Sequence, residues 1–406
     1  MEHRISNMIY PNAISDLQHQ LDNAPYTEMT ALAERLIKGA QNYDNYRVQK
    51  VIDDPEYVSG VVKDFNNATR FVANHIMGAP YADDLKAPLD AKGEFWNKGR
   101  RTTLDGQKYD IDENGLPINP YLETGITGLG VIGRYGPNHA VDVGLLSVQK
   151  DDSGQFALHA YGILKGKTPY FCGGFAEYDE LNQDGFIIGR DIWIDNQAKE
   201  FFEEMVSGSI ELLPEFSNHL DVKFQKEIAH RVERRGGIEV PEGEYNLVKK
   251  QIETELKMEQ VEKYDPEFFK RVRSFFAQGK ECYRGPVRSS TRNTNTSWME
   301  TYLSWAELDE QNWNSIRGDQ PVFDYQLSAG DDADGVKAHR IDSDLLDATT
   351  GTHSAMFLFM AASYVLNQQD KGYALTSGVM GQLKEVASFL EQIPSTPKIK
   401  YDHLQA

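Results

Sequence analysis

Apolar side chains recur at helical spacing near both ends of this chain. Within the first forty residues they stand three and four positions apart among polar residues, a spacing typical of amphipathic helices. These positions are Leu17, Leu21, Met29, Leu32, Ala33, Leu36 and Ile37. The same periodicity predicts a helix from about 55 to 77 and closing helices at 353–366 and 378–392. Both ends of the chain are therefore predicted to be helical.

The region between these ends changes from loops to strands. Residues 78–140 are rich in Gly, Pro, Asn and Asp, with a turn signal at 112–115 between short strand candidates. Farther on, apolar residues at 143–148, a turn at 151–154 and a second apolar run at 156–164 follow one another. This succession predicts a β-hairpin.

Long polar helices are predicted after this hairpin. Residues 192–212 read as helical, and 217–278 form a highly charged helical stretch that is interrupted at 235–237 and at Pro241. Residues 281–305 return to strand and loop. Because helices and strands do not alternate regularly, the predicted fold class is α+β, with a mixed sheet between helices.

Composition and charge limit the classes of partner. The 406 residues are 40% hydrophobic, enough for a core, and include 42 basic and 62 acidic side chains, a net charge of −20. Nucleic acids and anionic membranes require basic surfaces, so neither is expected as a partner. Cys172 and Cys282 are too few for a disulfide framework. Without an apolar signal segment or an apolar run long enough to span a bilayer, we expect a soluble cytoplasmic protein of undetermined oligomeric state.

Two motifs in this chain resemble ligand-binding sites, but the residues around them do not fit the structure that such sites require. The glycines of 128–133 match the dinucleotide-binding pattern, but Gly136 and Pro137 would break the helix that must begin there. Residues 110–121 start like a calcium-binding loop, yet Tyr121 stands where a glutamate ligand is required. A hairpin turn is the better interpretation of the second motif.

The pattern most typical of a metal-binding or catalytic site is a group of three glutamates. Glu200, Glu203 and Glu204 are spaced i, i+3 and i+4, which places their carboxylates on one face of a helix. Asp195 or Asn196 is a candidate cap for the start of this helix. Carboxylate oxygens are ligands for hard divalent ions such as Mg²⁺. The alternative from the triad alone is a solvated acidic surface.

The residues before this helix strengthen the metal hypothesis. Gly174 is followed five residues later by Glu180, and Lys199 directly precedes the first glutamate of the triad. Together these segments resemble the Nudix box, G-x5-E-x7-R-E-U-x-E-E-x-G-U, in which U is an apolar residue. The paired glycines, Gly173 and Gly174, allow a ligand to approach the backbone closely.

Further motifs narrow the resemblance. They match, in the same order, Nudix ADP-ribose pyrophosphatases of the mitochondrial type and the related tail domain of the ADP-ribose-gated melastatin-type channel. The motifs are 79–83, Asn119-Pro120, Thr124-Gly125, 130–140, Tyr283-Arg-Gly, 292–301, 329–333 and Val336-Lys337. The resemblance implies that a small nucleotide, ADP-ribose, is split into AMP and ribose 5-phosphate with Mg²⁺ or Mn²⁺.

The resemblance also implies the residues of the site. The triad would be catalytic and would hold the metal together with Glu180. Substrate would contact Gly174, Arg292, Asn138, His139, Asp331 and Asp332. Local alternatives exist: a structural ion pair for Arg292, a loop cap for Asn138, and a plain turn for the two aspartates. Trp298 and Tyr135 are candidates for stacking on adenine or for the core. The general base is not assigned.

The chain departs from the family pattern in several places. Between Glu180 and Lys199 lie eighteen residues where the family has seven, so 181–192 includes an insertion of eleven. Lys199 replaces the arginine of the box and lacks its bidentate geometry. Ser290-Thr291 replaces a frequent Asp-Pro, and a substrate-contacting tyrosine expected before His353 is absent. An ADP-ribose sensor without catalysis, or a hydrolase of NADH or a sugar nucleotide, therefore remains as an alternative.

The resemblance also predicts the domain organisation. Residues 1–140 would form an N-terminal lobe that contributes to the ligand pocket. Residues 141–370 would form the Nudix hydrolase domain, with a helical insertion at about 217–278. A C-terminal helix and tail would occupy 371–406.

Overall fold

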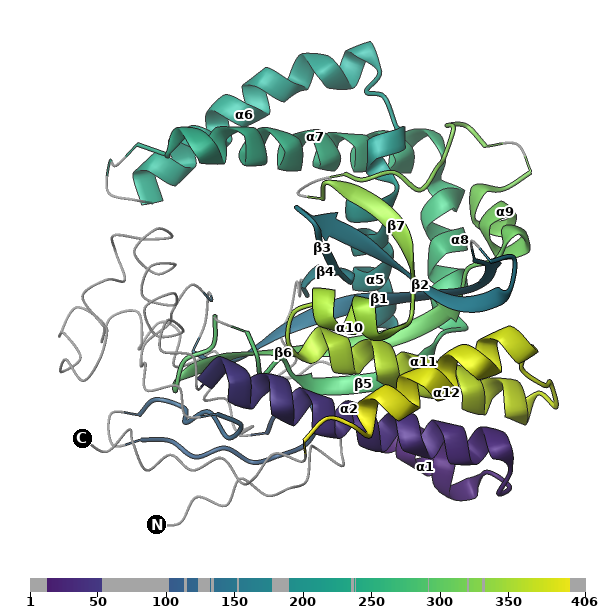
Figure 1. The fold of residues 1–406 in the computed structure, drawn as a ribbon. Helices are drawn as coiled ribbons and strands as arrows, with labels where there is room; N and C mark the ends of the chain where they lie inside the picture. Colours follow the sequence, from purple (N-terminus) through teal and green to yellow (C-terminus); the bar gives the residue numbers. More distant parts are fainter. Residues whose placement is uncertain are drawn as a thin grey trace.

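A mixed sheet with helices on both faces forms the centre of the computed structural model (Figure 1). The structure describes 13–52, 102–112, 115–122, 132, 135–151, 153–176, 190–234, 237, 239–290, 292–319, 321–330 and 333–394. The predicted α+β class with a mixed sheet between helices is confirmed, and it is the architecture expected of a Nudix fold. No helix in the described ranges is long and apolar enough to cross a membrane.

The sheet is built around the long strand β1. Its seven strands are β1 (Gly136–Lys150), β2 (Phe156–Lys165), β3 (Thr168–Tyr170), β4 (Cys172–Phe175), β5 (Lys280–Pro286), β6 (Ser297–Glu307) and β7 (Gly335–Arg340). The main order is β3-β2-β1-β6-β5, while β4 pairs with β1 and β7 with β2. Only the β1–β6 pair is parallel among these pairings. The predicted hairpin is confirmed, with Leu145 opposite Tyr161.

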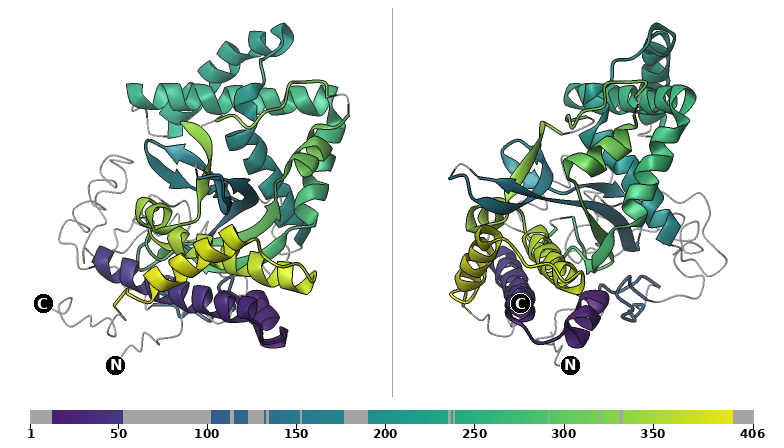
Figure 2. Two further views of the ribbon diagram at one scale, coloured as in Figure 1. Left: turned by 45° about the vertical axis from the view of Figure 1, so that its right-hand side comes forward. Right: turned by 90° about the vertical axis from the view of Figure 1, so that its right-hand side faces the viewer.

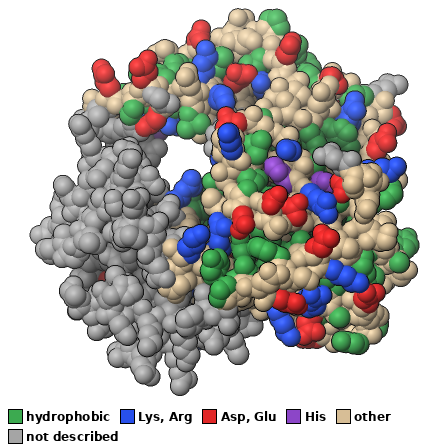
Figure 3. All heavy atoms as spheres, viewed as in Figure 1, with side chains coloured by type: hydrophobic (Ala, Val, Ile, Leu, Met, Phe, Trp, Pro, Cys, Tyr) green, Lys and Arg blue, Asp and Glu red, His purple; other side chains and the backbone are tan. Residues whose placement is uncertain are grey.

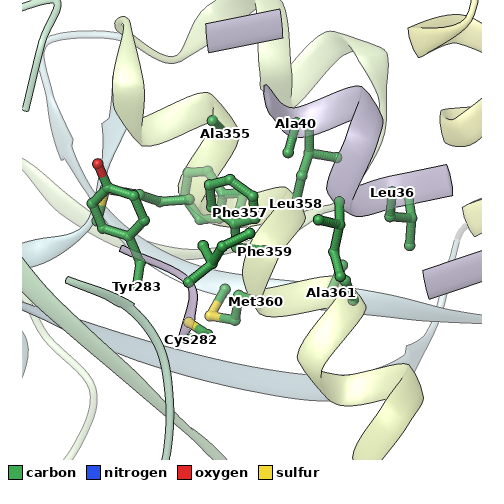
Figure 4. Close-up of a cluster of buried hydrophobic side chains, with 14 of the residues drawn as sticks. Leu36, Ala40, Cys282, Tyr283, Ala355, Phe357, Leu358, Phe359, Met360 and Ala361 are labelled. Atoms are coloured by element: carbon green, nitrogen blue, oxygen red, sulfur yellow. The ribbon is translucent and has the colours of Figure 1, made fainter. Parts of the chain in front are cut away.

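Helices from both ends of the chain cover one face of the sheet. They are α1 (Ser15–Asn23), α2 (Glu28–Ile52), α10 (Ser343–Ala348), α11 (Thr352–Asp370) and α12 (Ser377–Leu390). Apolar residues of α2, α11 and β5 meet in the core shown in Figure 4, where Leu36, Leu358 and Tyr283 are buried. Helix α11 is buried on nearly all sides, as expected for a helix that is apolar all round. The ends of the chain thus share one core.

The opposite face is covered by α5 (Arg190–Met205), α8 (Pro266–Ala277) and α9 (Glu310–Arg317). Phe201 and Phe202 of α5 are fully buried against Phe276 and Phe268 of α8. Two long helices, α6 (Pro214–Arg234) and α7 (Glu242–Tyr264), form a hairpin at the top of the view in Figure 1. In all three views α7 lies between α6 and the rest of the molecule (Figures 1 and 2).

Most helices lie where the sequence predicted them, with differences at their ends. The stretch 217–278 contains the predicted breaks and one further break at Asp265, because Pro266 begins a new helix. The helix predicted at 192–212 ends at Met205, followed by a 3₁₀ turn, η3 (Ser207–Ser209). Ser328 N–H donates to the carbonyl of Met205, and Gly330 N–H donates to that of Glu204, so a distant segment ends the helix.

The predicted cap of α5 is wrong. The helix begins at Arg190, so Asp195 and Asn196 lie inside it. Asp195 pairs with Arg273 at 2.7 Å, and the Asn196 amide donates to the carbonyl of Ile192. Asp195 and Asn196 are residue types that cap helices, but they stand five and six residues after the first residue of the helix.

The two ligand-like motifs behave as expected where they are described. Gly136 begins a strand and not a helix, so the glycine motif before it lacks dinucleotide-binding context. Tyr121 is buried, and its hydroxyl donates to Asp105 at 2.5 Å. Asp112 and Gly115 form a turn in which the Gly115 N–H donates to the Asp112 carbonyl. The predicted helix at 55–77 and the site candidates Glu180, Asp331 and Asp332 lie outside the described residues.

Candidate functional site

The paired glycines at β4 run directly over helix α5. A Cβ atom at Gly174 would lie 2.5 Å from Glu200 Oε1, and one at Gly173 would lie 2.8 Å from Asp142 Oδ1. Neither position can therefore hold a larger residue without displacing a carboxylate. This close approach brings the backbone after β4 against the first glutamate of the triad.

Glu204 is anchored to the same backbone. Its side chain is 5% exposed; Oε2 accepts a 2.7 Å hydrogen bond from Gly173 N–H, and Oε1 lies 3.5 Å from Lys165 Nζ. Hydrogen bonds to a charged acceptor are about twice as strong as those between neutral groups. Gly173 and Lys165 therefore fix the orientation of the last glutamate of the triad.

A fully buried amide sets the rotation of α5. Gln197 Nε2 donates to the carbonyl of Asp142 on β1 at 3.0 Å, and its Oε1 accepts from Ser304 on β6 at 2.9 Å. Because Gln197 lies one turn before Glu200 and two turns before Glu204 on the same helical face, this contact directs both glutamates toward the end of β4. Sequence reasoning missed Gln197; a polar residue among the apolar positions of the helix was the available signal.

The three glutamates share a helical turn, as predicted, but point to different neighbours. Glu200 lies under Gly174, Glu204 contacts Gly173, and Glu203 lies 3.8 Å from Lys199. Within the described part of the chain, no three Asp, Glu, His or Cys side chains are placed to hold a metal ion. The donors themselves fit a hard divalent ion, because they are carboxylate oxygens. Lys165 and Lys199 lie beside two of these carboxylates and would compete with such an ion.

A buried aspartate and a histidine lie on the other side of the paired glycines. Asp142 accepts a 2.6 Å hydrogen bond from Thr301, and burial raises its pKa while His353 and Lys165 oppose that shift. Burial lowers the pKa of His353, Asp142 raises it, and Lys165 and Arg292 lower it further. These residues therefore act on one another electrostatically. Sequence reasoning did not assign Asp142 or Lys165 to the site, although a carboxylate between Val141 and Val143 was a usable signal.

His353 is held by aromatic rings. The rings of Tyr170 and Phe171 meet it edge-on, with centroids 5.9 and 5.8 Å away. Its Nδ1 is buried and has no hydrogen-bond partner among the described residues. His353 therefore offers a ring nitrogen that is unpaired within the described part of the chain, next to Tyr170 and Phe171, which precede β4.

The remaining predicted substrate residues lie on two segments. Asn138 is buried, with its amide donating to the Gly136 carbonyl at 3.1 Å and to Ser297 Oγ at 3.3 Å. His139 Nε2 lies 3.5 Å from Glu300 Oε2, and its carbonyl accepts from Ala176 N–H just after β4. His139 is thereby joined to the chain that leaves the paired glycines.

Arg292 lies on the connection between β5 and β6. Its side chain is exposed, and its backbone N–H donates to Ser290 Oγ at 3.2 Å. Burial is the main cause of the lowered pKa of His353, and Arg292 contributes to it after Lys165. Ser289 of the same connection accepts from Thr352 N–H at 2.6 Å, so this connection meets the start of α11, which carries His353. The stacking candidates Trp298 and Tyr135 are each 1% exposed and belong to the core.

Comparisons with known proteins identify relatives of this chain. No protein-family model matches it. It is 25% identical over 236 residues to Transient receptor potential cation channel subfamily M member-like 2 of Nematostella vectensis, covering 58% of this chain and 11% of that protein. It is 31% identical over 121 residues to mitochondrial ADP-ribose pyrophosphatase of Rattus norvegicus, covering 29% of this chain and 34% of the relative.

A third relative, Putative nudix hydrolase 6 of Caenorhabditis elegans, is 38% identical over 63 residues, covering 13% of this chain and 24% of that protein. The chain thus spans between 11% and 34% of the length of these relatives. The relationship to Nudix hydrolases and to a melastatin-type channel, predicted from the ordered motifs, is confirmed.

Proposed function

We propose that this chain is a Nudix hydrolase that splits the pyrophosphate of ADP-ribose into AMP and ribose 5-phosphate. One observation carries the proposal: Gly174 passes over the Glu200 carboxylate while Gly173 N–H binds Glu204 at 2.7 Å. The strand and helix of the box therefore meet despite the insertion between them. The relationship to a mitochondrial ADP-ribose pyrophosphatase supports the choice of substrate.

Glu200, Glu203 and Glu204, together with Glu180, would hold the divalent ion, Mg²⁺ or Mn²⁺. When bound, such an ion neutralises pyrophosphate charge and acidifies a water molecule for attack on phosphorus. The protein supplies the orientation of the ligands, since Gly173 N–H holds Glu204 and Gln197 holds the helix.

Other side chains would act on the substrate directly. The exposed guanidinium of Arg292 is suited to pair with a phosphate through charge-assisted hydrogen bonds. His139 would border the pocket from β1, next to the chain that leaves β4. Asp331 and Asp332 remain candidates for a ribose hydroxyl.

An ADP-ribose sensor without turnover is the second candidate. It is supported by the channel relative, which aligns with more of this chain than the other relatives described do. Lys199 in place of arginine also weakens the orientation of Glu203, with 3.8 Å between the charged atoms. A hydrolase of NADH or a sugar nucleotide is the third candidate.

Turnover of ADP-ribose by the full chain with Mg²⁺, followed as AMP release, separates these functions. We expect the native protein to release AMP. The variant Glu203→Gln/Glu204→Gln should lose at least about 100-fold in kcat/KM. Even residues that only hydrogen-bond to metal ligands change metal affinity or activity by about 10–100-fold when they are replaced. Glu385→Gln on α12 removes an exposed carboxylate from the other face and serves as the matched control.

Each outcome assigns one function. Binding of ADP-ribose in a calorimeter without AMP release would identify a sensor. Release of a nucleotide from NADH or a sugar nucleotide, but not from ADP-ribose, would identify the third candidate. Unchanged turnover in the double variant would remove the glutamates from the site.

A further inference from the structure

A buried ion pair joins the N-terminal helix α2 to the connection between β5 and β6. Arg288 Nη1 lies 3.2 Å from Asp44 Oδ2, with side-chain exposures of 2% and 3%, and 2.8 Å from Asn45 Oδ1. A buried ion pair often contributes little to stability compared with apolar residues of the same size, but breaking it leaves an uncompensated charge. The pair therefore couples the position of the β5–β6 connection to helix α2.

Hydrogen bonds connect the residues on either side of Arg288 with Asn293 and β6. Asn293 Nδ2 donates to the Val287 carbonyl at 2.8 Å, and Asn293 Oδ1 accepts from Met299 N–H at 2.9 Å. Arg292 N–H donates to Ser290 Oγ. These hydrogen bonds connect the backbone next to Arg288 with the backbone next to Arg292.

The residue next to Arg288 is linked to the start of α11. Thr352 N–H donates to Ser289 Oγ at 2.6 Å. Gly351 leaves room for Ser289, because a Cβ there would overlap its hydroxyl. The residue after Thr352 is His353, which packs edge-on against Tyr170 and Phe171, just before β4. Asp44 holds Arg288, and the adjoining Ser289 binds the start of α11, so α2, α11 and the β5–β6 connection meet here.

We propose that Asp44 is a positioning residue, which acts through Arg288 and the adjoining Ser289. It would thereby hold Arg292, and His353 beside Tyr170 and Phe171, at the candidate site. The inference rests on the proposed function of Arg292 as a phosphate-binding residue. It gives helix α2 a part in the site, although the helix lies on the opposite face of the sheet from α5.

Steady-state hydrolysis of ADP-ribose by the full chain with Mg²⁺ tests this role. Asp44→Asn should raise KM about tenfold and change kcat less than about twofold, because it loosens a substrate contact that persists through the reaction. In an Arg292→Ala background the same change should alter KM less than about twofold, since coupled residues are not additive. Equal effects in both backgrounds would overturn the proposal.

A control and a second variant separate positioning from folding. Arg35→Ala breaks the exposed 2.7 Å ion pair between α2 and α12, with Arg35 38% exposed, and should leave KM unchanged. Asp44→Asn alone leaves the buried charge of Arg288 without its partner and should lower the melting temperature. Asp44→Asn/Arg288→Gln removes both buried charges and should restore cooperative melting. A glutamine at position 288 is too short to replace both contacts, so KM should stay raised. A KM that recovers with the melting temperature would mean a structural role alone.

Hydrogen exchange provides a measurement that does not depend on turnover. The backbone N–H of Met299 donates to Asn293 Oδ1. In Asp44→Asn this amide hydrogen should exchange at least about tenfold faster than in the native protein. The exchange of core amides of α5 should not change. Unchanged exchange at Met299 would overturn the positioning role even if the native protein releases no AMP. Absent AMP release with faster exchange would reject the proposed hydrolase and keep the positioning role.

Discussion

Lys165 shows how single residues determine the candidate site. Its ammonium lies at the end of β2, 3.5 Å from Glu204, and its charge also acts on Asp142 and His353. A metal ion bound by Glu204 would meet this ammonium as a like charge. Lys165 thus compensates the carboxylates when no ion is bound and opposes the binding of one.

Replacement of this lysine tests that balance. Lys165→Met should tighten Mn²⁺ binding about fivefold, roughly 1 kcal/mol, since the lysine is 37% exposed and its effect is screened. Isothermal titration with Mn²⁺ measures this directly. Lys167→Met, an exposed lysine on the same β2–β3 turn, should leave the affinity unchanged. An unchanged or weaker affinity in Lys165→Met would contradict the competition.

At the scale of elements, close contacts between helices decide how the faces of the sheet are covered. Gly39 of α2 faces α12, and a Cβ there would lie 2.6 Å from Leu390 Cδ1 and 2.8 Å from Leu390 Cβ. Gly381 of α12 has no other atom within 4 Å of such a position. The two glycines therefore differ in the space that is available for a side chain at their positions.

The same substitution at these two glycines should have opposite effects. Gly39→Ala forces α2 away from α12 and should lower the free energy of unfolding by about 1–3 kcal/mol. Gly381→Ala meets open space and should raise it by about 0.5–1 kcal/mol, because alanine restricts the unfolded chain and favours the helix. Urea denaturation followed by circular dichroism measures both. Equal signs for the two variants would mean that the helices do not pack as described.

At the scale of the whole molecule, the charge of −20 is distributed and not concentrated at the site. Figure 3 shows acidic and basic side chains interspersed over the described part of one face. Many of them form exposed ion pairs, such as Lys223 with Glu259 and Lys384 with Glu28, which add little stability individually. Of the three glutamates of the triad, Glu204 is buried, and Glu200 and Glu203 are half-buried.

Glu281 on β5 should make global stability depend on pH. Burial raises its pKa to about 7, Arg284 opposes this shift, and Asp16 adds to it. Between its usual pKa of 4.5 and about 7, the folded protein binds a proton that the unfolded chain has lost. This contribution is complete below pH 4.5 and is lost as pH rises through 7.

Removal of this titration should change the pH profile of unfolding. The unfolding free energy of Glu281→Gln minus that of the native protein should rise by about 1–3 kcal/mol when the pH is raised from 4 to 8. Denaturant unfolding at several pH values between these limits measures the difference. Parallel profiles for the two proteins would show that Glu281 does not titrate in this range. The equivalent change at exposed Glu385 should leave the profile unchanged.

The candidate site could be predicted in part from the sequence. The spacing of Glu200, Glu203 and Glu204 places them on one helical turn, and the paired glycines lie where a close approach is needed. Asp142, Lys165 and Gln197 could not be assigned in the same way, because their neighbours come from other strands. The metal-binding role of the triad stays a prediction.

By itself, the sequence determined most of the long helices, the hairpin, and the residues that a single turn brings together; α9, α10 and β7 were not predicted from it. Local periodicity and the freedom of glycine depend on neighbours in the chain, so the hairpin and α11 could be predicted from them. Tertiary structure alone decided where α5 ends, since residues 328–330 bind its last carbonyls. It also joined Asp44 to Arg288, 244 positions away, because such contacts depend on how the sheet brings distant segments together.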